Sequence, residues 1–187
     1  MIKRDNFFKN YIKNSSSYRN NLKKTKKIFN SFLNDLKNFD IPLIETYEKD
    51  YQLDFSMKMV KKFSKYQNII IIGLGGSILG TKSIYSFFKK KIKKNVFFFD
   101  NLDPNLNLEF KKIKNLKSSC FITVSKSGKT IETIINLGSV FSKSLFKNKL
   151  VIITQLTDNG LIDIANKYNA EIIEHKEFIS GRYSVLS

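Results

Sequence analysis

The hydrophobic positions of this 187-residue chain follow two different patterns, and the change between them falls near residue 67. Up to that point, apolar residues recur at the spacing of amphipathic helices. One predicted helix ends before Pro42, and its apolar face consists of Leu22, Phe29, Phe32, Leu33 and Leu36. A second is predicted over residues 54–66, with Asp54 as N-cap and an inward face of Phe55, Met59, Val60 and Phe63. The pattern therefore predicts a helical extension over residues 1–67.

From residue 68 onward, short and continuously apolar runs alternate with amphipathic stretches. Such runs are typical of parallel strands that are covered on both faces. The predicted strands span residues 68–72, 95–100, 119–124, 149–154 and 170–174. The predicted helices span residues 78–93, 104–116, 131–146 and 159–168; Asp103-Pro104 suits the start of the second, and Asp158 or Asn159 that of the fourth. We therefore expect an α/β domain over residues 68–187, with a doubly wound, five-stranded parallel sheet.

The topology of such a sheet predicts where a ligand binds. Ligands lie beyond the carboxyl ends of the strands, at the point where the strand order reverses. In the flavodoxin-like order 2-1-3-4-5, that point lies between the first and third strands. The segments that follow these two strands are GLGGS (73–77) and SKSGKT (125–130), the strand ends richest in glycine and hydroxyl groups. Pattern and topology thus select the same place.

Both loops have the chemistry that a phosphoryl group requires, namely closely approaching N–H donors, hydroxyls and a helix N-terminus. The first loop offers backbone access at Gly73, Gly75 and Gly76, followed by Ser77. The second offers three hydroxyls, a glycine for a tight turn and two ammonium groups, which belong to Ser125, Lys126, Ser127, Gly128, Lys129 and Thr130. Either loop alone is equally well explained as an ordinary capped turn. Together they favour a phosphate site.

Two better-known phosphate motifs do not fit these loops. GLGGSILG lacks the third glycine of a dinucleotide fingerprint, because Ile78 stands there, although Asp100 occupies the place of a ribose-binding acid. VSKSGKT lacks the leading glycine of a P-loop, because that position is Thr123. We therefore reject both interpretations.

Composition restricts the remaining function classes. The net charge is +17, but the lysines are scattered from Lys3 to Lys176, and abundant Lys, Asn, Ile, Phe and Tyr fit AT-rich codon bias. We find no nucleic-acid-binding motif and expect neither a nucleic-acid nor a membrane partner. The longest aliphatic run is Ile69 to Ile72, and the N-terminus does not resemble a signal peptide, so we expect a cytoplasmic protein. The single cysteine, Cys120, lies in an apolar run and is expected to be a buried, reduced thiol.

Three segments resemble motifs of the glucose-6-phosphate isomerase family, whose domains belong to the sugar isomerase (SIS) class. IIGLGGSILG resembles its GIGGSxLG loop, VSKSGKTIET its SK[ST]xTTxET phosphate loop, and SGRYSVLS its GGR[YF]S segment. They occur in family order, and the likeness covers roughly residues 69–187. Lys129 stands where the family usually has threonine, and Ser180 replaces the first glycine of GGR.

The resemblance implies roles for particular residues. Gly75, Gly76 and Ser77 would line the sugar site, while Ser125, Lys126, Ser127 and Thr130 would hold the phosphate. Gly181 would lie near the substrate, and Arg182 would stabilise the negative charge of an enediolate intermediate. The family interconverts glucose 6-phosphate and fructose 6-phosphate in glycolysis and gluconeogenesis without a metal or cofactor, as a homodimer.

The resemblance also implies that part of the catalytic machinery is absent. The family's glutamate base, ring-opening histidine and late lysine lie beyond its arginine segment, whereas this chain ends five residues after Arg182. His175 precedes Arg182, so we interpret it as a structural or surface residue, and Glu132 as an orienting or capping group. We therefore expect a C-terminally truncated isomerase that is inactive alone. The alternative is a non-catalytic SIS module that binds a phosphosugar.

Overall fold

The computed structural model describes residues 15–38, 42–141, 149–182 and 184–186. The chain forms two compact units, residues 1–51 and residues 52–187. The first unit contains helix α1 (Ser15–Lys37) and the 3₁₀ helix η2 (Pro42–Tyr47). The predicted apolar stripe lies on α1, but Leu22, Phe29 and Phe32 of that stripe are exposed. The division at residue 67, with a sugar-phosphate-binding domain over residues 68–187, stays a prediction.

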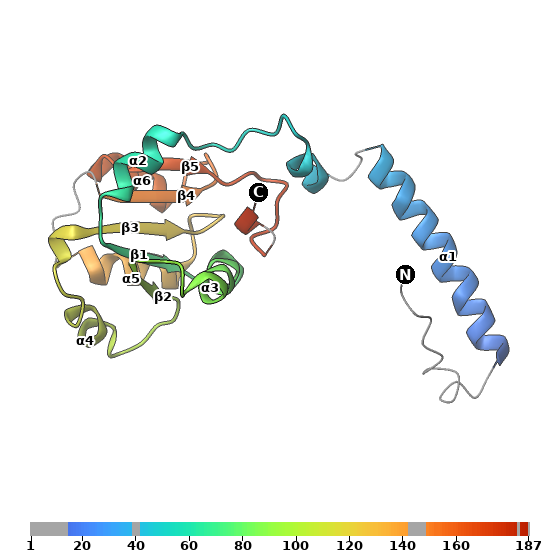
Figure 1. Ribbon diagram of the computed structural model, residues 1–187, viewed down its shortest axis with the longest axis horizontal. Helices are drawn as coiled ribbons and strands as arrows, with labels where there is room; N and C mark the ends of the chain where they lie inside the picture. Colours follow the sequence, from blue (N-terminus) through green and yellow to red (C-terminus); the bar gives the residue numbers. More distant parts are fainter. Residues whose placement is uncertain (1–14, 39–41, 142–148, 183, 187) are drawn as a thin grey trace. The chain divides into compact units, whose positions relative to one another are not determined.

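The second unit is built on a parallel sheet, with strand order β2-β1-β3-β4-β5 (Figure 1). Its strands are β1 (Asn68–Gly73), β2 (Asn95–Phe99), β3 (Ser119–Val124), β4 (Leu150–Thr154) and β5 (Glu171–Glu174). Every neighbouring pair is parallel. The five predicted strands and the predicted order are therefore confirmed. They were predictable because parallel strands covered on both faces have continuously apolar sequences.

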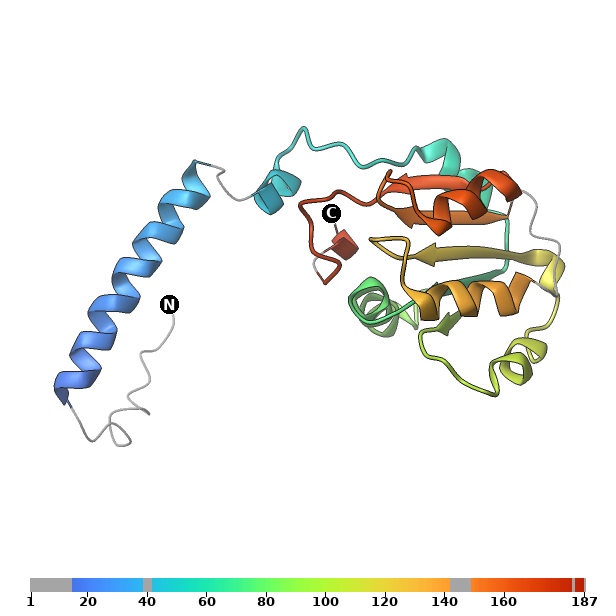
Figure 2. The same ribbon diagram turned by 180° about the vertical axis from the view of Figure 1, so that it is seen from behind.

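The helices form layers on the two faces of the sheet. One face is covered by α4 (Leu106–Lys111), α5 (Ile131–Phe141) and α6 (Gly160–Tyr168), and α5 and α6 lie in front of the strands in Figure 2. Helix α3 (Gly76–Phe88) packs on the opposite face near Gly73, and α2 (Met57–Ser64) precedes β1. The described part of this unit also contains the short 3₁₀ helices η3 (Leu116–Ser118) and η4 (Ser184–Leu186).

The main core lies between the sheet and the layer of α4, α5 and α6. Alternate strand residues meet the inward faces of these helices, and the fully buried members include Ile70, Ile72, Phe121, Leu150, Ile152, Leu137, Val140 and Leu161. Each such side chain stabilises the fold by about 1.5–3 kcal/mol relative to exposure. This core holds the strand ends, and thus the loops that follow them, in fixed positions.

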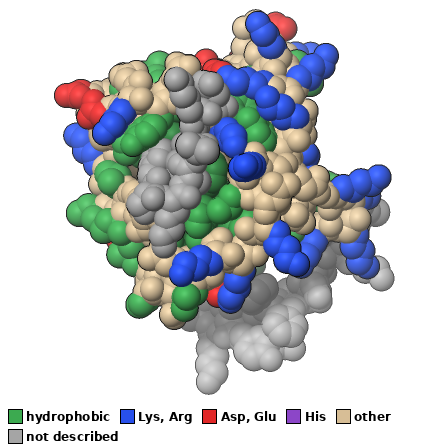
Figure 3. Space-filling model, turned by 90° about the vertical axis from the view of Figure 1, so that its left-hand side faces the viewer, with side chains coloured by type: hydrophobic (Ala, Val, Ile, Leu, Met, Phe, Trp, Pro, Cys, Tyr) green, Lys and Arg blue, Asp and Glu red, His purple; other side chains and the backbone are tan. Residues whose placement is uncertain are grey.

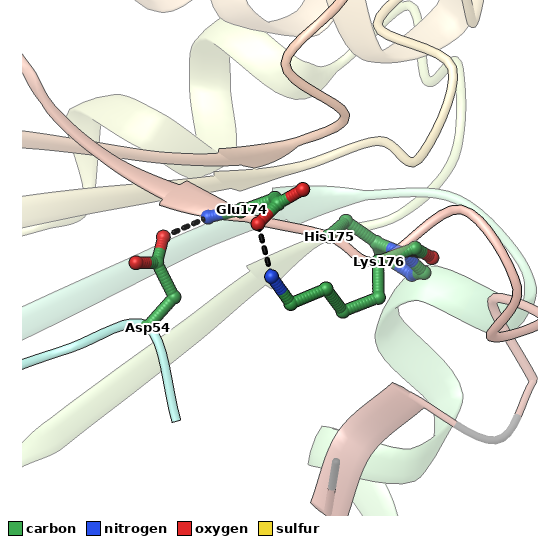
Figure 4. Close-up of polar contacts among 4 residues, drawn as sticks. All are labelled: Asp54, Glu174, His175 and Lys176. Atoms are coloured by element: carbon green, nitrogen blue, oxygen red, sulfur yellow. Dashed lines mark hydrogen bonds and ion pairs between the residues drawn. The ribbon is translucent and has the colours of Figure 1, made fainter. Parts of the chain in front are cut away.

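The start of α2 differs from the prediction. The helix begins at Met57, and the Ser56 hydroxyl accepts a hydrogen bond from the Met59 N–H, so Asp54 is not the cap. Instead, the Asp54 carboxylate accepts a hydrogen bond from the Glu174 N–H at 2.6 Å (Figure 4). The Asp54 side chain, which the local pattern assigns to a helix cap, thus binds a residue that is distant in sequence. Phe55 and Val60 are exposed, which also corrects the predicted inward face.

Other helix boundaries differ in the same way. The Asp103 carboxylate accepts from the Asn105 N–H at 2.7 Å and forms a turn, so α4 begins two residues beyond Pro104 and is short. Helix α3 starts before its predicted range and ends at Phe88. Asn159 caps α6, as one of the two alternatives predicted. Residues 142–146 of the predicted third helix of the α/β domain lie outside the described residues.

The Lys and Arg side chains do not gather in one patch on the face that Figure 3 draws. Figure 3 shows Lys and Arg side chains scattered around the visible face, with hydrophobic side chains between them. Within the described ranges, no helix is long and apolar enough to cross a membrane.

Candidate functional site

The two glycine- and hydroxyl-containing loops leave neighbouring strands at the same edge of the sheet. Gly73 of β1 is the register partner of Val124 of β3, and these are the last residues of the two strands. Neighbouring parallel strands lie about 5 Å apart, so GLGGS and SKSGKT start side by side. One loop leads into α3 and the other into α5.

The first loop turns sharply at Gly75, where φ is +54°. Its carbonyl accepts hydrogen bonds from the N–H groups of Ile78 and Leu79, at 3.1 and 3.0 Å, and so starts α3. A residue with a Cβ strains this left-handed conformation, which explains the glycine. Nothing lies within 4 Å of the position that a Cβ on Gly75 would take, so the backbone is open at this residue.

The second loop, residues 125–130, places its hydroxyls before the first turn of α5. The buried Ser125 Oγ lies 2.9 Å from Thr130 Oγ1, and the Ser127 hydroxyl accepts a hydrogen bond from the Lys129 N–H at 3.3 Å. Gly128 has φ of +62°, and a Cβ there would lie 1.9 Å from the Asn159 side-chain oxygen. The close approach and the positive φ both require glycine. Hydroxyls and free N–H groups at a helix N-terminus suit an anion.

Residues 175–182 and 184–186, which we call the arginine segment, cross the ends of the strands and reach α3 (Figures 1 and 2). A Cβ on Gly76 would lie 2.9 Å from Arg182 Cγ, 3.0 Å from the Arg182 nitrogen and 3.1 Å from the carbonyl carbon of Gly181. A Cβ on Gly181 would lie 3.9 Å from the Ser77 hydroxyl. The third motif of the sequence therefore packs directly on the first.

The arginine segment is also attached to the second loop. The Lys126 ammonium donates a hydrogen bond to the Glu177 carbonyl. Thr154, at the end of β4, binds both parts: its carbonyl accepts from the His175 N–H at 2.9 Å, and its hydroxyl donates to the Lys126 carbonyl at 3.3 Å. Ile179 is buried and anchors the middle of the segment. All three motifs thus meet at one edge of the sheet.

His175 is buried at the start of the arginine segment, with 4% of its surface exposed. Its Nδ1 lies 3.1 Å from the Lys176 carbonyl, which only accepts, so Nδ1 carries the proton and Nε2 is left without a hydrogen-bond partner. Burial lowers the pKa of the imidazole below its usual 6.5; the bond to the Lys176 carbonyl opposes this, and the Lys126 charge adds to it. In Figure 4 the ring points away from the Glu174–Lys176 ion pair. The residue is a neutral, structural histidine.

The cysteine is a buried thiol, as predicted. Burial raises the pKa of Cys120 to about 11, so the nucleophilic thiolate does not form at neutral pH. Among the described residues, no group of three or more His, Cys, Asp and Glu side chains is placed to hold a metal ion.

The chain is similar in sequence to proteins of a known family. Residues 54–187 match the family model described as phosphoglucose isomerase. The chain belongs to this family. It is 37% identical over 145 residues to the glucose-6-phosphate isomerase of Methanocaldococcus jannaschii, which covers 74% of this chain and 35% of the relative. It is 35% identical over 135 residues to that of Borreliella afzelii, which covers 66% of this chain and 25% of the relative.

One solved structure agrees with this family assignment, and a second shares the fold. A glucose-6-phosphate isomerase from Chlamydia trachomatis superposes with a TM-score of 0.57 at 26% identity, over 68% of this chain and 25% of the other. A hypothetical protein from Thermus thermophilus superposes with a TM-score of 0.62 at 21% identity, over 82% of this chain and 36% of the other, and shows the fold alone. The chain thus spans 36% or less of the length of each of these four proteins.

The structure brings together Gly75, Gly76, Ser77, Ser125, Ser127, Thr130, Gly181 and Arg182 at one edge of the sheet. The ammonium of Lys126 is held by the Glu177 carbonyl, and Lys129 and Arg182 are exposed. Glu132 lies in the first turn of α5.

Sequence reasoning missed two residues that shape this site. Asn159 fills the space beside Gly128, although the sequence identified it only as a possible helix cap. Thr154 joins the second loop to the arginine segment, and no motif marks it.

Proposed function

We propose that this chain supplies the phosphosugar-binding part of a glucose-6-phosphate isomerase, which interconverts glucose 6-phosphate and fructose 6-phosphate through a cis-enediol. The observation that carries the proposal is the convergence of three motifs: the first loop, the paired Ser125 and Thr130 hydroxyls, and the arginine segment. The phosphate would lie at the N-terminus of α5, and the sugar would extend toward Gly75–Ser77.

In this proposal, the side chains act on different parts of the substrate. Ser125, Ser127 and Thr130 would bind the phosphate with hydroxyl and backbone donors, which makes the same contact before and during reaction. The guanidinium of Arg182 would stabilise the charge that develops on the enediolate, because it is planar and always protonated. The proton transfer between C1 and C2 requires a carboxylate base, for which no residue of this chain matches the family motif.

The alternative is a non-catalytic SIS module that binds a phosphosugar. It shares the phosphate-binding loops and differs in having no base anywhere in the whole protein. The coding sequence on the carboxyl side of Ser187 distinguishes the two, since an isomerase requires a further glutamate and histidine there.

We expect the 187-residue chain to bind glucose 6-phosphate weakly without turning it over. Calorimetric titration should show that glucose 6-phosphate binds more tightly than inorganic phosphate, and that glucose does not bind. Thr130→Ala should weaken binding by about tenfold, whereas Thr25→Ala, which removes a hydroxyl from exposed α1, should not. Equal affinity for phosphate and glucose 6-phosphate would contradict the sugar site. Clear formation of fructose 6-phosphate in a coupled assay would show that the chain contains its own base.

A further inference from the structure

Lys126 lies in the middle of the phosphate-binding loop, yet its side chain is used elsewhere. Its ammonium donates to the carbonyl of Glu177 in the arginine segment. Lys129, which directly follows the glycine turn of the same loop, is exposed, and no side-chain hydrogen bond or ion pair of it is found within the described part of the chain. The two lysines therefore differ in environment, although they carry the same charge.

The backbone around Lys126 is firmly held by β4. The Gln155 N–H donates to the Lys126 carbonyl at 2.9 Å, and the Thr154 hydroxyl donates to it at 3.3 Å. The Thr154 carbonyl in turn accepts from the His175 N–H. The loop and the beginning of the arginine segment thus share one strand end as an anchor, and the Lys126 side chain adds a second connection beyond it.

Glu177, which accepts the hydrogen bond from Lys126, lies close in sequence to Arg182. Between Glu177 and Arg182, Ile179 is 2% exposed, and its N–H donates to the Lys176 carbonyl at 3.2 Å, which closes a turn. Gly181 and Arg182 then contact Gly76. Glu177 and Arg182 are thus joined by a short stretch of chain that includes the buried Ile179.

From these contacts we propose that Lys126 is a positioning residue. It fastens the arginine segment to the phosphate-binding loop, so that binding of the phosphate also fixes Arg182 beside the sugar. A charge-assisted hydrogen bond to a carbonyl suits this role, because it is stronger than a neutral one. The effect of phosphate binding on Arg182 rests on the proposed phosphosugar site, whereas the attachment of the arginine segment by Lys126 does not. The competing role is the one expected from the family motif, in which Lys126 binds the phosphate directly.

Hydrogen exchange of the 187-residue chain tests the fastening without any ligand. Lys126→Met removes the ammonium and keeps the length of the side chain, and we expect it to speed exchange in residues 177–182 by about fivefold or more. Lys126→Arg should restore slow exchange, because it keeps a donor and a charge. Lys129→Met, which removes the same charge from the same loop, should leave these residues unchanged. Unchanged exchange in Lys126→Met overturns the proposal.

Protection in β1 and β3 shows whether the fold survives the substitution. If Lys126→Met loses this protection, the same comparison is made with Lys126→Gln, which keeps a shorter polar side chain. Slow exchange in residues 177–182 of that folded variant would also overturn the proposal.

A second measurement adds glucose 6-phosphate. In the unsubstituted chain the ligand should protect residues 125–130 and 177–182 together, whereas in Lys126→Met it should protect only residues 125–130. Loss of ligand protection at both places in Lys126→Met, with normal exchange before the ligand is added, would identify Lys126 as a direct ligand and overturn the proposal. If the ligand protects neither region even in the unsubstituted chain, the proposed function fails, while the ligand-free comparison still decides the role of Lys126.

Discussion

Gly76 joins two motifs that lie far apart in the sequence, because it has no side chain. Besides the Arg182 Cγ, the Arg182 nitrogen and the Gly181 carbonyl carbon lie 3.0 and 3.1 Å from the position that its Cβ would take. The latter two are main-chain atoms, and they cannot move aside as the end of a flexible side chain can. A glycine that the sequence explains by ligand access therefore has a packing role as well.

Gly76→Ala should destabilise the fold by about 1–3 kcal/mol, since overpacking forces a backbone shift. It should also displace Arg182 and weaken binding of glucose 6-phosphate. Gly138→Ala is the matched control, because Gly138 lies on α5 with open space around it, and alanine there should stabilise the helix by about 0.5–1 kcal/mol. Urea unfolding of both variants measures the difference. Equal stability of Gly76→Ala and the unsubstituted chain would contradict the close packing of the arginine segment.

His175 should make the stability of the fold depend on pH. Its pKa is lowered in the folded chain, so below about pH 6.5 the unfolded chain binds more protons, and the free energy of unfolding falls as the pH falls. The slope is at most about 1.4 kcal/mol per pH unit. His175→Leu, which removes the only histidine, should reduce the loss of stability between about pH 7.5 and pH 5.5. Parallel pH profiles of the two proteins would show that burial does not shift this imidazole.

At the scale of elements, the capping residues explain which boundaries were predictable. Asn159 accepts hydrogen bonds from the Leu161 and Ile162 N–H groups, so a local pattern correctly predicted the start of α6. Asp54 and Asp103 suit caps equally well by sequence, yet one binds β5 and the other forms a turn. A side chain that can cap a helix can also satisfy other donors, and tertiary contacts decide between them.

Asn159 should therefore contribute more to the stability of the fold than its neighbour Asp158. Its amide group also donates to the Gln155 and Thr157 carbonyls, and the residue is buried. Asn159→Ala should cost about 1–3 kcal/mol, because buried partners lose their hydrogen bonds. Asp158→Ala, at an exposed position, should change stability little. Thermal unfolding of both variants measures this difference, and similar midpoints would contradict the assigned cap.

At the scale of the whole molecule, the parallel sheet places the second loop, residues 125–130, and the arginine segment at one edge. There they would act on different ends of one substrate. Family members of full length extend well beyond the region that this chain matches. The division of roles between Thr130 and Arg182 is therefore testable in a full-length isomerase that contains this chain.

In such an enzyme, Thr130→Ala should mainly raise KM, with a loss of about 1–2 kcal/mol, because the phosphate has the same charge before and during reaction. Arg182→Ala should mainly lower kcat, by about 100-fold or more, because enediolate charge develops only in the transition state. Arg182→Lys should recover part of the loss, since an ammonium does not reproduce a planar guanidinium. Steady-state kinetics decides the matter, and a near-normal kcat for Arg182→Ala would make the arginine structural.

The sequence by itself determined the strands, their parallel arrangement and the two loops that follow β1 and β3. Continuous apolar runs and glycine turns are local signals, and the sheet topology brings the carboxyl ends together. Only the tertiary structure decided that Lys126 turns to Glu177, that Asp54 binds β5 and that His175 is buried. Each of these side chains has several possible partners, and the choice depends on which groups the folded core brings within hydrogen-bonding distance.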